Sequence, residues 1–195
     1  MSKNNWDKKY PSVTAVLDIL RKKGLESWFK KNTEAFCDAE SKKSREIGSL
    51  VHKIIQTHIE CEKIEIETSY PDEVKNAVKS FFKFKKDFPN LKLQNAELSL
   101  VNEKHKYNGT IDCIAREGNE LILIDWKTGK CNVDTEKETE YPPIYNEHLY
   151  QAAAYTCLYN EQDWLYDEQK QTGSKIEKTM IVVIAKDKIS YKPLI

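Results

Sequence analysis

Two acidic residues and a lysine lie where the sequence predicts a buried β-hairpin. Gly118 and Asn119 can form the two-residue turn of such a hairpin. With that turn, Asp112 on the first strand faces Asp125 on the second, and two carboxylates held this close must share a proton or bind a cation. Lys127 follows Asp125 by two residues and therefore lies on the same face of the strand.

An acid, a second acid and a lysine at one sheet edge predict metal-assisted hydrolysis of a phosphodiester. Carboxylates are the oxygen ligands that Mg²⁺ or Mn²⁺ prefers, and the metal polarises phosphate and activates water. The lysine can orient that water or stabilise developing negative charge. Taken singly, an Asp and a Lys at a strand end more often form a solvent-exposed salt bridge. A three-residue turn would also separate the acids.

Apolar residues occupy both faces of this hairpin, so we expect it to lie at the centre of a sheet with both faces covered. The alternation of side chains along a strand assigns the residues to faces. The face of the two acids is expected to carry Ile114, Leu121 and Leu123, and the opposite face Ile111, Ala115, Ile122, Ile124 and Trp126.

The order of periodic segments predicts an α/β or α+β domain with a central mixed β-sheet flanked by helices. Ser12 or Thr14 is expected to cap a first helix that ends before Gly24. Further helices are expected at 25–39, 44–60, 71–88 and 147–160, strands at 92–101, 107–116 and 120–127, and a closing hairpin at 178–194. We expect one domain over residues 1–195, mainly helical in 1–90, with the catalytic sheet and a C-terminal helix and hairpin in 91–195.

Composition favours a soluble protein. No apolar run approaches the roughly 20 residues of a membrane helix, and we see no signal or transit peptide, so cytoplasm, of a bacterial or phage-infected cell, is expected. The five cysteines lack the spacing of zinc or iron–sulfur ligands. The net charge is zero, but Lys and Arg outnumber Asp and Glu by 12 to 8 in residues 1–60 and by 5 to 2 in 171–195. This can give phosphate a basic face, although solvated helix faces explain it as well.

Three short motifs, in this order, resemble the PD-(D/E)XK nuclease superfamily. They are Gly109-Thr-Ile-Asp112 with Asp125-Trp-Lys127, the upstream Gly48-x-x-x-His52, and the downstream Gln151-x-x-x-Tyr155. The last two resemble elements of the RecB-type branch. The N-terminal segments "YPSVTAVL" and "LESWFKK" resemble the opening of its phage-type and mitochondrial genome maintenance exonucleases.

The resemblance implies a restriction-endonuclease-like core with N-terminal helices, and it implies roles for individual residues. His52, Asp112, Asp125 and the backbone carbonyl of Trp126 would bind Mg²⁺ or Mn²⁺, and Lys127 would position or activate the attacking water. Glu97, one strand earlier, would serve a second metal or the water, or would only be polar surface. Gln151 and Tyr155 would line the site. The other histidines, His58, His105 and His148, are expected to pack or cap, and no iron–sulfur cluster is expected.

The function expected from these features is a stand-alone, metal-dependent DNA exonuclease of recombination, repair or replication. It would act on single strands or duplex ends, with no membrane association and with any helicase, recombinase or single-strand-binding protein as a separate partner. An endonuclease of the same fold, structure-specific or of restriction type, and a catalytically silent DNA-binding protein are the alternatives. Phosphate contacts are expected from Arg21, Lys22, Lys23, Lys30, Lys31 and Arg45.

Overall fold

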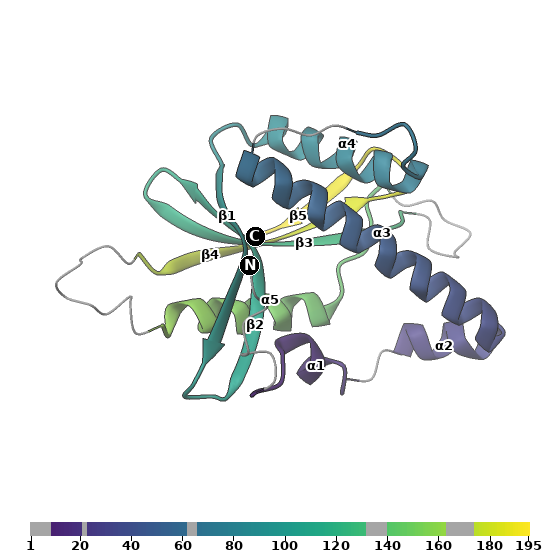
Figure 1. Cartoon of the computed structure of the whole chain (residues 1–195), viewed down its shortest axis with the longest axis horizontal. Coiled ribbons are helices and arrows are strands. Elements are labelled where there is room, and N and C mark those ends of the chain that lie inside the picture. Colours follow the sequence, from purple (N-terminus) through teal and green to yellow (C-terminus); the bar gives the residue numbers. More distant parts are fainter. Residues whose placement is uncertain (1–8, 21–22, 62–65, 132–139, 163–173) are drawn as a thin grey trace.

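The computed structural model describes residues 9–20, 23–61, 66–131, 140–162 and 174–195. Four helices precede three consecutive strands, and a further helix leads to a closing pair of strands (Figure 1). The elements are α1 (Val13–Leu17), α2 (Lys23–Lys31), α3 (Glu34–Cys61), α4 (Asp72–Asp87), β1 (Lys92–Asn102), β2 (Tyr107–Glu117), β3 (Glu120–Gly129), α5 (Asn146–Asn160), β4 (Ile176–Ala185) and β5 (Tyr191–Leu194).

The strands form one mixed sheet in the order β1-β2-β3-β4-β5. Three of its pairings are antiparallel, whereas β3 and β4 run parallel because α5 carries the chain back between them. The turn between β2 and β3 contains Gly118 and Asn119, as predicted, and Gly118 has a φ of 58°. That left-handed conformation suits glycine, which has no Cβ to clash.

Helices cover both faces of the sheet (Figure 1). On one face, α3 and α4 pack against β2, β3 and β4, and α3 supplies Ile47, Val51, Ile54 and Ile55 to this core. On the other face, α1 and α5 pack against β2 and β3. The central position predicted for the β2–β3 hairpin is therefore confirmed. None of the helices in the described part of the chain combines the length and the apolar character needed to cross a bilayer.

The predicted boundaries of the N-terminal helices are wrong. The first helix is capped by Ser12, whose Oγ accepts a hydrogen bond from the Ala15 N–H, but it ends at Leu17. Ile19 is 82% exposed, so extending the helix through this residue would bury no further apolar side chain there. Gly24 accordingly lies inside α2. The boundary between the helices expected at 25–39 and 44–60 is also misplaced. The helical conformation is interrupted at residues 32–33, and the 28-residue helix α3 then runs without a break to Cys61.

The predicted alternation of β2 fails at one point. Ile111 packs in the core of α1 and α5 together with Ile114, whereas Cys113 faces α3 and α4. The faces therefore switch at Asp112. On the neighbouring strand, Glu97 has a φ of 52°, and the register passes from Ala96↔Cys113 to Leu98↔Ile111 without a pair between. This local irregularity frees Asp112 and Glu97 from the regular pleat of the sheet.

Candidate metal and active site

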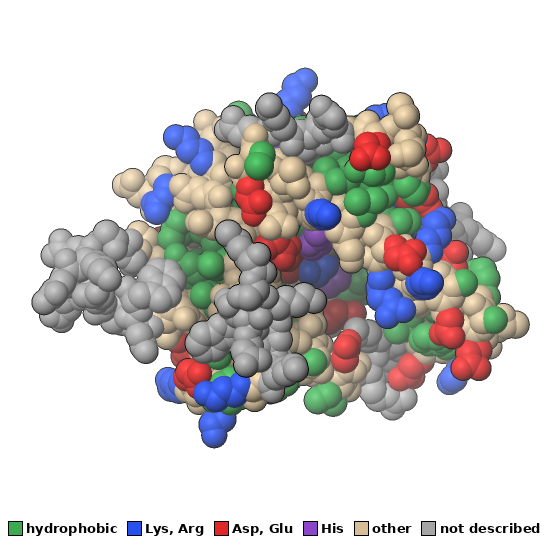
Figure 2. Space-filling view, in the orientation of Figure 1, with side chains coloured by type: hydrophobic (Ala, Val, Ile, Leu, Met, Phe, Trp, Pro, Cys, Tyr) green, Lys and Arg blue, Asp and Glu red, His purple; other side chains and the backbone are tan. Residues whose placement is uncertain are grey.

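Three side chains from separate elements converge beside this irregularity. His52 of α3, Glu97 of β1 and Asp112 of β2 each offer a ligand atom, and these atoms lie within 4.8 Å of one another. His52 Nδ1 is 3.7 Å from Asp112 Oδ1 and 4.0 Å from Glu97 Oε1. Figure 2 shows a hollow in the middle of this face of the molecule, where acidic, basic and histidine side chains meet.

The position of His52 follows from the close approach of α3 to the sheet. Gly48, one turn before His52, lies so near β3 that an added Cβ would be 3.4 Å from the Thr128 Oγ1. That distance is ordinary van der Waals contact, so α3 packs directly on β3 at Gly48 and a methyl group would also fit there. Burial, followed by the positive charge of Lys127, lowers the pKa of His52. At neutral pH the imidazole is therefore uncharged and has a lone pair for a metal.

Glu97 is held in a strained conformation. Its φ of 52° lies in the left-handed region, which costs a residue with a side chain on the order of 1–3 kcal/mol. Strain of this kind persists only where the surrounding structure enforces it, and it is concentrated at functional sites. Burial and the neighbouring Asp112 raise the pKa of Glu97. The sequence alone leaves the role of Glu97 open, whereas the fold brings its carboxylate beside His52 and Asp112.

Asp125 and Lys127 lie alongside the three converging side chains. The Asp125 side chain is fully buried, and its Oδ2 is 2.5 Å from the Lys127 Nζ. No other donor among the described residues satisfies its oxygens. Asp112 accepts a hydrogen bond of 2.8 Å from the Trp126 N–H, and Lys127 Nζ is 3.5 Å from the Trp126 carbonyl oxygen. The last regular pair of the hairpin is Cys113↔Ile124, one step before the two acids.

The chemistry of this donor set fits a divalent cation. Burial raises the pKa of both Asp112 and Asp125, and Lys127 opposes the rise for each of them. One ammonium is thus shared by two buried carboxylates, while Glu97 adds a third nearby. Carboxylate oxygens suit Mg²⁺ or Mn²⁺, and a neutral imidazole suits a transition metal. His52, Glu97 and Asp112 could hold such an ion, with Asp125, whose Oδ2 is paired with Lys127, at its border.

On the opposite face, Gln151 and Tyr155 of α5 form a connected pair. Gln151 Nε2 donates to the Tyr155 hydroxyl over 2.9 Å. Burial, opposed by the Gln151 hydrogen bond, raises the pKa of Tyr155 to about 12, with smaller contributions from Asp112 and Asp125. Tyr155 is therefore within electrostatic reach of the acids. Gly109 makes this possible, because an added Cβ there would lie 2.6 Å from the Tyr155 ring.

The basic residues expected to contact phosphate are only partly placed. Lys30 and Lys31 are exposed on α2, at the end of α3 that lies away from α4 (Figure 1). Arg45 is exposed on α3, seven residues before His52 and hence about 10 Å from it along the helix axis. Arg21 and Lys22 lie outside the described residues, as does the side chain of Lys23.

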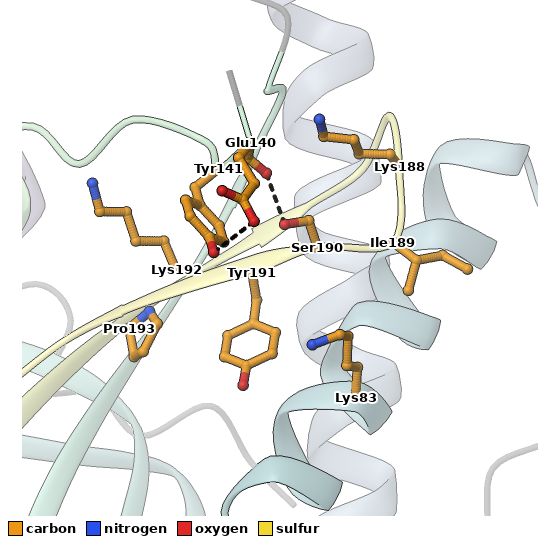
Figure 3. A pocket seen from close by; sticks show the side chains of 9 residues that line it. All are labelled: Lys83, Glu140, Tyr141, Lys188, Ile189, Ser190, Tyr191, Lys192 and Pro193. Carbon is orange, nitrogen blue, oxygen red and sulfur yellow. Dashed lines mark hydrogen bonds between the residues drawn. The ribbon is translucent and has the colours of Figure 1, made fainter. Parts of the chain in front are cut away.

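A separate pocket lies elsewhere on the molecule. It has a volume of about 480 Å³ and is bordered by the β4–β5 turn, α4 and the segment before α5 (Figure 3). Lysine side chains stand at its edge, and Glu140 accepts hydrogen bonds from Tyr141 and from Ser190. None of the predicted site residues lines it. The convergence of ligand atoms, and not the size of a hollow, therefore identifies the candidate site.

Comparison with known proteins agrees with this geometry. The model of the PD-(D/E)XK nuclease superfamily matches residues 27–191. The chain belongs to this superfamily. Its mixed sheet flanked by helices is accordingly a restriction-endonuclease-like core.

Other comparisons add little to the superfamily match. Fifteen chains of solved structures match. One is the crystal structure of SSO0001, which is 18% identical with a TM-score of 0.33 over 75% of this chain and 63% of that chain. The present chain thus spans just under two thirds of SSO0001. No curated protein matches the sequence.

Proposed function

We propose that the protein is a Mg²⁺- or Mn²⁺-dependent DNA exonuclease that hydrolyses phosphodiester bonds. The observation that carries this proposal is the meeting of His52, Glu97 and Asp112 beside the buried pair of Asp125 and Lys127. Five ionisable groups from α3 and three neighbouring strands share one small volume, which a fold without chemistry has no reason to assemble.

His52, Glu97, Asp112 and Asp125 would hold the metal, with the Trp126 carbonyl beside them. When bound, the ion polarises the phosphodiester and lowers the pKa of an attacking water. The protein contributes the fixed positions of these donors. Trp126 secures Asp112 through its backbone N–H, and the burial of Asp125 excludes water that would compete for its oxygens.

Lys127 is the candidate for stabilising charge and orienting water. Its ammonium is paired with Asp125 and is 20% exposed, so it borders both the acids and solvent. With Asp125 among the residues that would hold the metal, Lys127 would be able to donate to the attacking water or to a phosphate oxygen that gains negative charge. Tyr155 and Gln151, which are hydrogen-bonded to each other, would contact the substrate from the other face of the sheet.

Two elements resemble those of RecB-type nucleases, and on this resemblance we favour exonuclease chemistry over the endonuclease alternative. The Gly48-x-x-x-His52 element lies where α3 packs on β3, and its His52 Nδ1 is 3.7 Å from Asp112 Oδ1. The Gln-x-x-x-Tyr element forms its internal hydrogen bond on α5. A role in recombination, repair or replication, and any helicase or recombinase partner, stay predictions.

The test is digestion of end-labelled linear DNA and closed circular DNA with Mg²⁺, Mn²⁺ or EDTA. We expect linear DNA to be degraded from its ends only with metal, and the closed circle to stay intact. Lys127→Met should abolish the reaction, whereas Lys92→Met, which removes an exposed lysine at the start of β1, should leave it unchanged. Cutting of the circle would establish the endonuclease alternative, and digestion by the Lys127 variant would refute the proposed site.

A further inference from the structure

A second lysine is buried near the candidate site without an anionic partner. Lys186 directly follows β4, is 5% exposed, and donates from Nζ to the Ser44 Oγ over 2.9 Å. Within the described residues, no carboxylate oxygen lies within 4.0 Å of this nitrogen. An ammonium has three donors and carries a full charge, so a single neutral hydroxyl leaves most of its requirement unmet.

The charged groups around Lys186 do not supply the missing anion. Lys43 pairs with Glu73, with their nearest atoms 2.5 Å apart, and Lys130 lies 4.0 Å from Glu40. Each of these two glutamates thus already has a lysine of its own, and the adjacent carboxylate of Asp187 accepts hydrogen bonds from the Cys131 N–H. Burial, followed by the repulsion of Lys130, lowers the pKa of Lys186. An uncompensated buried cation is costly, and an entering anion would relieve that cost.

Lys186 contacts the same helix, α3, that carries the metal-binding candidate His52. On α3, Ser44 contacts Lys186 beyond β4, Gly48 lies against Thr128 of β3, and His52 contacts Asp112 of β2. Ser44 and His52 are eight residues apart, about 12 Å along the axis. At a rise of about 3.4 Å per nucleotide along the axis of a duplex, this distance corresponds to three or four nucleotides.

We propose that Lys186, with Lys130 and Lys43 at its mouth, binds an internal phosphodiester of the DNA strand a few nucleotides from the bond that is cleaved. The inference rests on the proposed nuclease function and adds a second contact that sets the path of the strand. Lys43, Lys130 and Glu40 are about half exposed, so their side chains can move aside and admit a phosphate oxygen to the Lys186 ammonium. The phosphate supplies the charge that Glu40 and Glu73 do not.

A purely structural role for Lys186 gives different expectations. If the ammonium only fastens β4 to α3, its replacement destabilises the fold and leaves DNA affinity unchanged. If it is held for a phosphate, Lys186→Met removes an uncompensated charge, so the free protein is as stable as wild type or more stable. The same substitution then weakens DNA binding. Lys186→Gln keeps a donor for Ser44 and tests the charge alone.

The experiment measures binding of a fluorescent single-stranded oligonucleotide, in EDTA and over a range of salt concentrations. Both Lys186 variants are compared with wild type and with Lys92→Met, and urea unfolding is followed for each. We expect a loss of affinity of about five- to tenfold for the Lys186 variants. The slope of log affinity against log salt should fall by about 0.7, the value for one phosphate contact on a single strand. Lys92→Met should change neither the affinity nor the slope.

The outcomes separate this inference from the proposed function. If wild type digests DNA and the Lys186 variants bind as wild type does, the phosphate site is overturned and the nuclease assignment stands. If the wild-type protein binds no DNA, both the phosphate site and the nuclease assignment are refuted. An oligonucleotide with a terminal phosphate provides a further arm, because an internal contact predicts the same loss with or without that group. A loss confined to the phosphorylated strand would overturn the internal site.

Discussion

Replacing Asp125 with asparagine is expected to stabilise the metal-free protein while abolishing hydrolysis. Asn has the shape of a protonated carboxyl, so it removes the charge and leaves the packing unchanged. Burial raises the pKa of Asp125 from 3.8 to about 6, although Lys127 works in the opposite direction. The raised pKa of Asp125 therefore already includes the effect of the ion pair with Lys127. The ionised carboxylate still destabilises the fold.

The size of the expected stabilisation follows from the rise in the pKa of Asp125. One pH unit corresponds to about 1.4 kcal/mol, so the ionised Asp125 destabilises the metal-free fold by about 3 kcal/mol well above pH 6. Asp112 titrates together with Asp125 and retains its own charge in the variant, so the gain seen for one substitution should be about 1–3 kcal/mol. Since the folded pKa is raised, the wild type loses stability as the pH rises from about 4 through about 6.

Urea unfolding in EDTA at pH 8 and at pH 4.5 provides the measurement. Asp125→Asn should exceed wild type in the free energy of unfolding at pH 8, and the difference should shrink at pH 4.5, where the wild-type carboxyl is largely protonated. Asp87→Asn is the control of opposite sign, because Tyr191 and Lys83 hold the pKa of Asp87 below its usual range. That control should lose stability at pH 8. A less stable Asp125 variant at pH 8 would refute the reasoning.

Two further predictions concern the metal and the packing beside it. Millimolar Mn²⁺ should raise the melting temperature more at pH 8 than at pH 5, because protons compete for carboxylates whose pKa values are raised. If Mn²⁺ raises the melting temperature of Glu97→Gln as much as that of wild type, Glu97 is not a ligand. Gly109→Ala should destabilise the fold by about 1–3 kcal/mol in urea unfolding, because its Cβ would overlap the Tyr155 ring at 2.6 Å. The Gly109→Ala, Tyr155→Leu double variant removes that ring and should recover part of the loss, whereas strictly additive losses would contradict the overlap.

Much of the fold was determined by local sequence patterns. The strands β1, β2 and β3, the helix α5 and the closing hairpin begin and end within a few residues of their predicted positions. Alternating apolar residues and the Gly118-Asn119 turn fix the register of the hairpin, because a shift of one residue would expose its core face. The short N-terminal helices were less predictable, since α1 buries Val13 but leaves Ile19 exposed.

The sequence by itself determined which residue types could bind a metal, and the order of motifs pointed to Asp112, Asp125, Lys127 and His52. Only the tertiary structure decided how these groups meet. The positive φ of Glu97 and the switch of faces at Asp112 arise where β1 and β2 fit together, and no local pattern encodes them. Lys186 carries no motif, because its burial depends on Ser44, which lies 142 residues away along the chain. Spacing along a strand or helix is a local property, whereas burial and the absence of a counter-ion depend on which distant segments pack together.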